Sequence, residues 1–154
     1  MAPKDEAEAE LLASKQRFES FLDDYKAGRW ASATISLYFA FEHTAKTLLA
    51  ATGITVSSHN GVTNQLSLHF VKNKTIDPSV NRYLSNLYER RTTAEYSPQR
   101  ESEFTKKEVD AFFSWYEASC KELLPLLEKR YGINASAIQD LLDEYYSTTS
   151  GMTV

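Results

Sequence analysis

Two adjacent arginines followed by a tyrosine form the segment best suited to chemistry. The segment reads Arg90-Arg91-Thr92-Thr93-Ala94-Glu95-Tyr96. A guanidinium group presents a planar fork of N–H donors that matches phosphate oxygens, and a nearby hydroxyl or carboxylate could orient an RNA 2′-hydroxyl. The structural alternative is that the helix dipole favours cations at a helix C-terminus. We take Arg90, Arg91, Glu95 and Tyr96 as candidate site residues.

Two histidines are further candidates for ligand contacts. His43 lies on an apolar helical stretch with Glu42 and Lys46, which are four residues apart and can pair on the helix surface. A histidine in such a place is more often a hydrogen-bonded core residue than a catalyst. His59 follows Ser58 at the start of another helix, where serine is a typical cap and free N–H groups attract anions. Both histidines are kept as candidate nucleotide or RNA contacts.

The composition excludes several kinds of site. The chain has 154 residues, a net charge of −4 and the ordinary hydrophobicity of one globular domain. The single cysteine, Cys120, excludes a disulfide framework and a thiolate zinc site. No Walker loop, dinucleotide glycine pattern or HExxH is present, so we expect neither a metal nor another cofactor. Residues 71–107 carry 8 basic and 5 acidic side chains, a candidate anion-binding surface.

The chain also lacks the signals of export. No apolar run approaches the ~18 residues of a membrane span. The acidic stretch from Met1 to Glu10 has neither the basic start nor the apolar block of a signal peptide. We therefore expect a cytoplasmic protein that does not enter a membrane.

Apolar periodicity predicts an all-α, up-and-down bundle of four to five main helices plus a short C-terminal helix. Gly28, Gly53 and Gly132 mark helix ends, Pro125 predicts a kink or break near residue 121, and 94–102 is expected to be a loop. We divide the chain into a bundle over 1–130 and a C-terminal extension over 131–154, whose role stays open. The expected helices span residues 5–27, 29–52, 59–72, 77–93, 105–130 and 134–146.

The aromatic residues, 12% of the chain, support two interpretations. They could stack on nucleic-acid bases. At helical spacing, however, they are more typical of a core or a dimer interface. The residues concerned are Tyr83, Tyr88, Tyr96, Trp115 and Tyr116.

Four segments together resemble the small stand-alone HEPN proteins of bacteria and archaea. The resemblance extends over about residues 10–128, with the same order and spacing. Its segments are Tyr38-Phe39-Ala40-Phe41-Glu42-His43-Thr44-Ala45-Lys46-Thr47-Leu48-Leu49, Ser58-His59-Asn60-Gly61-Val62, Phe70-Val71-Lys72 and Leu87-Tyr88-Glu89-Arg90-Arg91-Thr92-Thr93-Ala94-Glu95-Tyr96.

The resemblance implies a helical bundle that forms a homodimer. Active members of the family are metal-independent endoribonucleases, many are toxins, and their partner is often a small nucleotidyltransferase antitoxin. Their signature is an Arg, four to six residues and a His at the dimer cleft. Arg91 matches that Arg, but Tyr96 stands where the shortest form of the signature has His, and no His follows His69. A tyrosine hydroxyl with a pKa near 10 moves protons poorly at neutral pH.

We therefore expect a HEPN protein of toxin–antitoxin type that acts on RNA or binds it. In that hypothesis Arg91 binds phosphate, Tyr96 takes the place of the family His, and Arg90 and Glu95 shape the cleft. Two alternatives stay open. One is a non-catalytic module that binds a nucleotide or RNA, and the other is a dimeric interaction protein that uses the aromatic helix faces.

Overall fold

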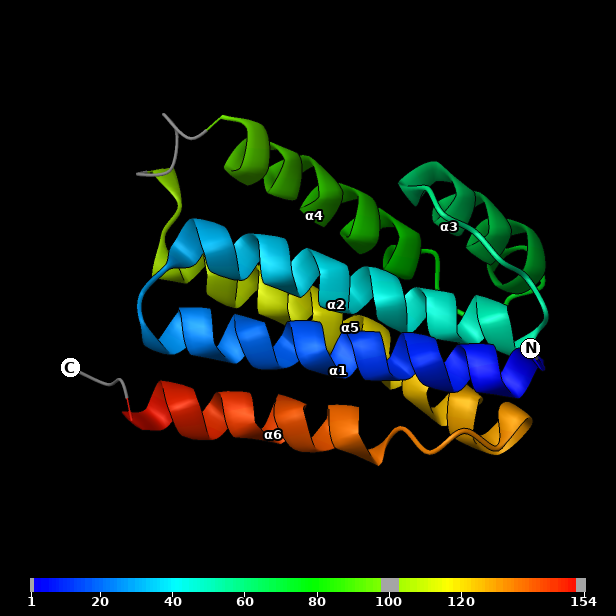
Figure 1. Cartoon of the computed structure of the whole chain (residues 1–154). Coiled ribbons are helices and arrows are strands. Elements are labelled where there is room, and N and C mark those ends of the chain that lie inside the picture. The colour runs from blue at the N-terminus through cyan, green and yellow to red at the C-terminus, as the bar shows by residue number, and fades with distance from the viewer. Residues whose placement is uncertain (1, 98–102, 152–154) are drawn as a thin grey trace.

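The computed structural model describes residues 2–97 and 103–151, and this part of the chain is a bundle of α-helices without strands (Figure 1). The long helices run in alternating directions along the chain (Figure 1). This arrangement confirms the expected all-α, up-and-down fold. The helices are α1 (Pro3–Lys26), α2 (Trp30–Ala51), α3 (His59–Leu66) with the π-helical turn η1 (Ser67–Val71), α4 (Ser79–Tyr96), α5 (Lys106–Tyr131) and α6 (Ser136–Gly151).

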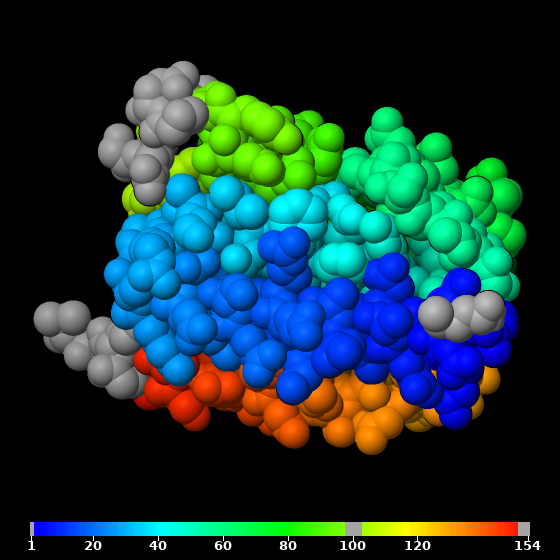
Figure 2. All heavy atoms as spheres, in the orientation of Figure 1, coloured from blue at the N-terminus to red at the C-terminus, as the bar shows by residue number. Residues whose placement is uncertain are grey.

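Helix α2 is the centre of the bundle. It packs against α1, α3, α4 and α5. Leu37, Phe41 and Leu48 are fully buried, as is typical of a helix that is apolar almost all round. Figure 2 shows where α2 still reaches the surface, bordered by α1 on one side and by α3 and α4 on the other.

Two helices begin with a side-chain cap at the expected position. Ser58 Oγ accepts a hydrogen bond from Gly61 N at 3.0 Å and begins α3. Thr105 Oγ1 accepts from Glu108 N at 3.2 Å and begins α5. Each cap satisfies one of the N–H groups that a helix start leaves without an intrahelical partner.

Two predicted helix ends are wrong, and the possible break near residue 121 does not occur. Helix α4 continues to Tyr96 instead of stopping at Thr93, and α6 continues to Gly151. Helix α5 passes through Pro125 without a break. Pro125 is exposed, so water can reach the carbonyl that loses its partner, and the buried Leu124 and Leu127 on either side hold the helix to the core.

Helix α6 lies along α1 and shares its core (Figure 1). The ring of Tyr145 stacks on Phe113 of α5 with centroids 3.5 Å apart, and its hydroxyl donates to Asp110 Oδ1 at 2.5 Å. The C-terminal segment, whose role the sequence leaves open, therefore covers an aromatic part of the bundle core. Its buried apolar residues are Ile138, Leu141, Leu142 and Tyr145.

Candidate functional site

Arg91 lies against aromatic rings from two helices. Its guanidinium carbon is 4.8 Å from the ring centre of Phe39, 5.5 Å from that of Tyr38 and 5.7 Å from that of Tyr88. These distances are in the range of cation–π attraction. Its Nε lies 3.0 Å from Glu95 Oε2, one helical turn further on, so the charges pair. The N–H bond of Nε does not point closely enough at this oxygen to form a hydrogen bond. The buried Nε has no other hydrogen-bond partner in the described chain.

His59 is held beside the same rings. The cap at Ser58 places it in the first turn of α3, where its ring lies flat on Tyr88 with centroids 4.1 Å apart and planes 6° apart. Its Nδ1 is 3.0 Å from the hydroxyl of Tyr38. Its Nε2 is 3.4 Å from the hydroxyl of Ser85. The structure thus brings Arg91, Glu95 and His59 to one junction of α2, α3 and α4.

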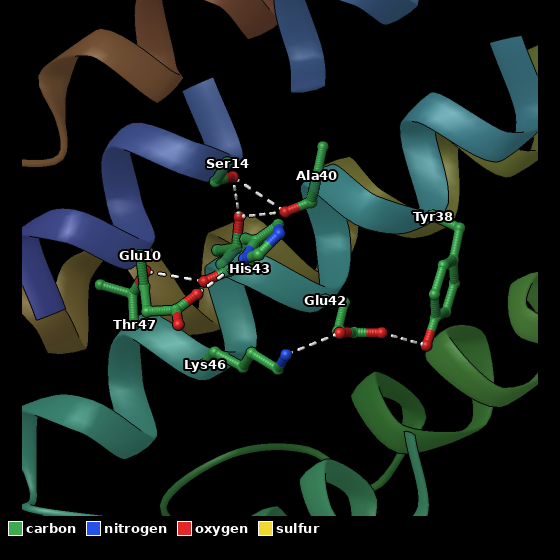
Figure 3. Close-up of polar contacts among 9 residues, drawn as sticks. Glu10, Ser14, Tyr38, Ala40, Glu42, His43, Lys46 and Thr47 are labelled. Atoms are coloured by element: carbon green, nitrogen blue, oxygen red, sulfur yellow. Dashed lines mark hydrogen bonds and ion pairs between the residues drawn. The ribbon is translucent and has the colours of Figure 1, made fainter. Parts of the chain in front are cut away.

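Behind His59 lies a buried carboxylate. Glu42 Oε2 accepts from the Tyr38 hydroxyl at 2.5 Å, and Glu42 Oε1 pairs with Lys46 Nζ at 2.9 Å. Figure 3 shows Glu42 between these two partners. The expected pairing of Glu42 with Lys46 is confirmed, but its place on the helix surface is wrong, because their side chains are only 10% and 13% exposed. The neighbouring helices cover this face of α2.

The charge states in this network follow from its contacts. Burial acts to raise the pKa of Glu42, but the hydrogen bonds from Tyr38 and Lys46 and the positive charge of Lys46 outweigh it and lower the pKa. Burial raises the pKa of Tyr38, and so do the hydrogen bond and negative charge of Glu42. Near neutral pH the site therefore holds an ionised Glu42 and a protonated Tyr38.

Arg90 turns away from Arg91. Its NH2 group donates to Glu108 Oε1 at 2.8 Å, and its guanidinium carbon lies 4.3 Å from the ring centre of Phe104. The carboxylate of Glu108 thus reaches across to Arg90 on α4. Arg90 ties α4 to the start of α5, and no contact in the described chain joins it to His59 or Arg91.

Tyr96 is not brought against Arg91. It is the last residue of α4 and is 68% exposed. Arg91 and Tyr96 are five positions apart in the chain. Because the helix continues through both, their side chains point about 140° away from each other around the helix axis. Tyr96 makes no hydrogen bond or ring contact within residues 2–97 and 103–151, so its ring is open to a ligand.

His43 is also separate from the junction. Its Nδ1 lies 2.6 Å from Glu10 Oε2 of α1, and Figure 3 shows it turned toward Glu10 while Tyr38 points to the other side. Among the aromatic candidates, Tyr116 cannot stack on a base, because it is fully buried and its hydroxyl hydrogen-bonds with Thr44 at 2.8 Å.

A comparison with known families covers most of this bundle. Residues 7–118 match the model of the HEPN domain. The chain belongs to the HEPN domain family. The HEPN match includes α1 to α4, the first half of α5 and the whole junction around Arg91 and His59, whereas α6 lies outside it.

Two relatives are similar to this HEPN chain. A protein of Methanocaldococcus jannaschii named "Putative toxin MJ0605" is 29% identical over 122 residues, which are 77% of this chain and 86% of that protein. A UPF0332 protein of Thermotoga maritima is 29% identical over 86 residues, which are 53% of this chain and 65% of that protein. No solved structure matches the chain significantly.

Sequence reasoning missed several members of the HEPN junction. Tyr38 and Ser85 were not candidates, and Glu42 and Tyr88 were given other roles. The spacing Tyr38-Glu42-Lys46 places these side chains on one face of an apolar helix, and this is the signal that could have indicated a buried polar network. No group of His, Cys, Asp and Glu that could hold a metal occurs among the described residues, and none of their helices could span a membrane.

Proposed function

We propose that this chain is a HEPN protein of toxin–antitoxin type that binds RNA at the junction of α2, α3 and α4. The name of the Methanocaldococcus jannaschii relative supports the toxin type. The observation that carries RNA binding is the position of Arg91, whose side chain is 15% exposed and stands on three aromatic rings.

The contacts of Arg91 leave room for a phosphate. Only its Nε faces Glu95, and no hydrogen bond occupies its terminal NH groups within the part of the chain that the structure describes. The rings hold the guanidinium plane in place, so less rotational freedom is lost when a phosphate binds. The exposed ring of Tyr96, five residues further along α4 and turned away from Arg91, offers a separate surface on which a neighbouring base can stack.

The remaining parts of the proposal rest on the family resemblance. We propose a homodimer in the cytoplasm, a small nucleotidyltransferase as the antitoxin partner, and no metal or other cofactor. A dimer would place two Arg91 junctions on one assembly. The alternative is a dimeric interaction protein that binds no RNA, and an absence of RNA binding by the wild-type dimer would favour it.

Arg91→Ala should weaken RNA binding about 10- to 100-fold, since a charge-assisted phosphate contact contributes about 1.5–3 kcal/mol. The measurement is fluorescence anisotropy with a labelled single-stranded RNA at two salt concentrations. The slope of the logarithm of affinity against the logarithm of salt concentration should also become shallower by about one, because about one counterion fewer is released on binding. Arg82→Ala is the matched control, because Arg82 is exposed on the same helix, over the ring of Tyr83 and near the charge of Asp77. Equal loss in both variants would mean that the contact is general charge attraction and not a site at Arg91.

Tyr96→Phe should keep RNA affinity within about threefold of wild type, whereas Tyr96→Ala should lose about 1–3 kcal/mol of stacking. The phenylalanine retains the ring and removes only the hydroxyl, so the pair of variants separates a stacking role from a proton-transfer role. The same proteins are assayed for RNA cleavage in EDTA. A large loss of cleavage in Tyr96→Phe would restore Tyr96 as the replacement for the family His.

A further inference from the structure

The proton positions around His59 follow from its neighbours. Tyr38 has one hydroxyl proton, and the 2.5 Å contact places that proton toward the carboxylate of Glu42. The Tyr38 oxygen can then only accept from His59 Nδ1, 3.0 Å away. His59 therefore carries its proton on Nδ1, and its Nε2 has a free lone pair. The chain Glu42–Tyr38–His59 fixes the tautomer as a carboxylate does for a catalytic imidazole.

We propose that His59 is the general base for RNA cleavage in this protein, with Nε2 as the atom that takes the proton of a 2′-hydroxyl. The inference rests on the proposed RNA binding at Arg91. In the family signature the His follows the Arg, but no His follows Arg91 in this chain. The proposal gives the role of that imidazole to His59 on α3. Tyr38 and Glu42 are positioning residues in this assignment.

The geometry of the junction supports a shared substrate. Arg91 and His59 flank the same two rings, those of Tyr38 and Tyr88. In this proposal one phosphodiester of the RNA spans from Arg91 to the imidazole along these rings. Nε2 points at the hydroxyl of Ser85 across 3.4 Å, which is long for a hydrogen bond between N and O. This weak contact leaves the Nε2 lone pair able to accept a proton from a substrate 2′-hydroxyl.

The reaction is an internal transfer that needs no metal or oxidant. His59 Nε2 takes the 2′-hydroxyl proton while O2′ forms a bond to the phosphorus atom. The bond from phosphorus to O5′ breaks, and the leaving O5′ receives a proton from the imidazolium or from water. The products are a 2′,3′-cyclic phosphate and a 5′-hydroxyl. Arg91 would stabilise the charge that develops on the phosphate oxygens.

The charge environment of His59 suits a base. Burial lowers its pKa, the negative charge of Glu42 on α2 raises it, and the positive charge of Arg91 on α4 lowers it, with a net decrease. The other titratable groups that face it are the hydroxyls of Tyr38 and Tyr88, and the Tyr38 hydroxyl stays protonated. The imidazole is therefore neutral at pH 7 and able to accept a proton.

The decisive experiment compares histidine variants of the full chain in single-turnover cleavage of a labelled RNA with EDTA present. His59→Ala should cut about 10²- to 10⁴-fold more slowly, with the RNA Kd within about threefold of wild type because the phosphate contact at Arg91 remains. Added imidazole should restore part of the lost rate, which a purely structural role would not allow. His69→Ala is the matched control, since His69 is exposed and its ring nitrogen Nε2 pairs with Gln65 Oε1 one turn earlier. Circular dichroism checks that each variant is folded, and His59→Asn replaces His59→Ala if the latter is not.

The pH profile is the second readout. The wild-type rate should rise with pH as His59 loses its proton and reach a plateau near neutrality. Glu42→Gln should move this rise to lower pH, because the Glu42 charge raises the pKa of His59. Wild-type protein that binds RNA without cutting it, or His59→Ala that cuts at the wild-type rate, would overturn the inference and leave RNA binding intact. Wild-type protein that binds no RNA would overturn the proposed function as well.

Discussion

Removal of residues 132–154 should leave a chain that does not fold. The segment contributes buried apolar side chains such as Ile138, Leu142 and Tyr145 to the core. At about 1.5–3 kcal/mol for each large side chain, their loss is on the order of 10 kcal/mol. That loss is as large as the whole stability of a typical domain, about 5–15 kcal/mol. The expected result is a loss of cooperative thermal melting in circular dichroism.

A pair of neighbouring tyrosines provides the matched point test. Tyr145→Ala should cost about 3–5 kcal/mol, because Tyr145 is 5% exposed and stacks on Phe113. Tyr146→Ala should cost far less, because Tyr146 is 50% exposed, its hydroxyl donates to Glu117 at the surface, and its ring meets Phe113 and Tyr145 edge-on. A truncated protein that melts like the full chain would show that α6 is an added element, free to dock on a partner.

Lys46→Met should destabilise the protein by about 3–5 kcal/mol near neutral pH, because it leaves the carboxylate of Glu42 buried without its cation. The two side chains are 13% and 10% exposed and 2.9 Å apart, so the ammonium group is the main compensation for the buried negative charge. Urea unfolding gives the change in free energy. Lys15→Met is the control, since its pair with Glu19 is 4.0 Å long and well exposed, and should contribute less than about 1 kcal/mol.

The effect of Lys46→Met should depend on pH in a defined direction. In the wild-type protein the pKa of Glu42 is lowered on folding, so its stabilising contribution is present above its unfolded pKa and is lost as pH falls through the folded one. Without Lys46, burial is less opposed and the pKa of Glu42 rises. The destabilisation should then shrink as pH falls and Glu42 becomes protonated. The double variant Glu42→Gln/Lys46→Met should recover most of the loss, and a loss that persists in it would mean that packing of the lysine stem dominates.

The sequence accounts well for local structure. The three- to four-residue apolar period places every long helix, and Ser58 and Thr105 begin α3 and α5 as expected. Errors concentrate at Pro125 and at the end of α4, where residues distant in sequence or exposure to water decide whether a helix continues. Four segments in the right order also indicate the family, and the family match confirms it.

The composition of the junction depends on contacts that no periodicity contains. His59 meets Tyr38 across 21 residues, and His43 meets Glu10 across 33. Both histidines follow equally plausible local patterns, yet only His59 faces the rings that hold Arg91. The direction of a side chain around α2 or α3 is set by its helix, but the partner it meets is set by how the helices pack.

The sequence by itself determined the all-α class, the family and the candidacy of Arg91, because these depend on residue type and spacing along one chain. Only the tertiary structure decided that Glu42 is buried, that Tyr96 points away from Arg91 and that His59 Nδ1 meets the hydroxyl of Tyr38. Those three outcomes depend on the neighbours of each atom in space, which set its desolvation and its hydrogen-bond partners.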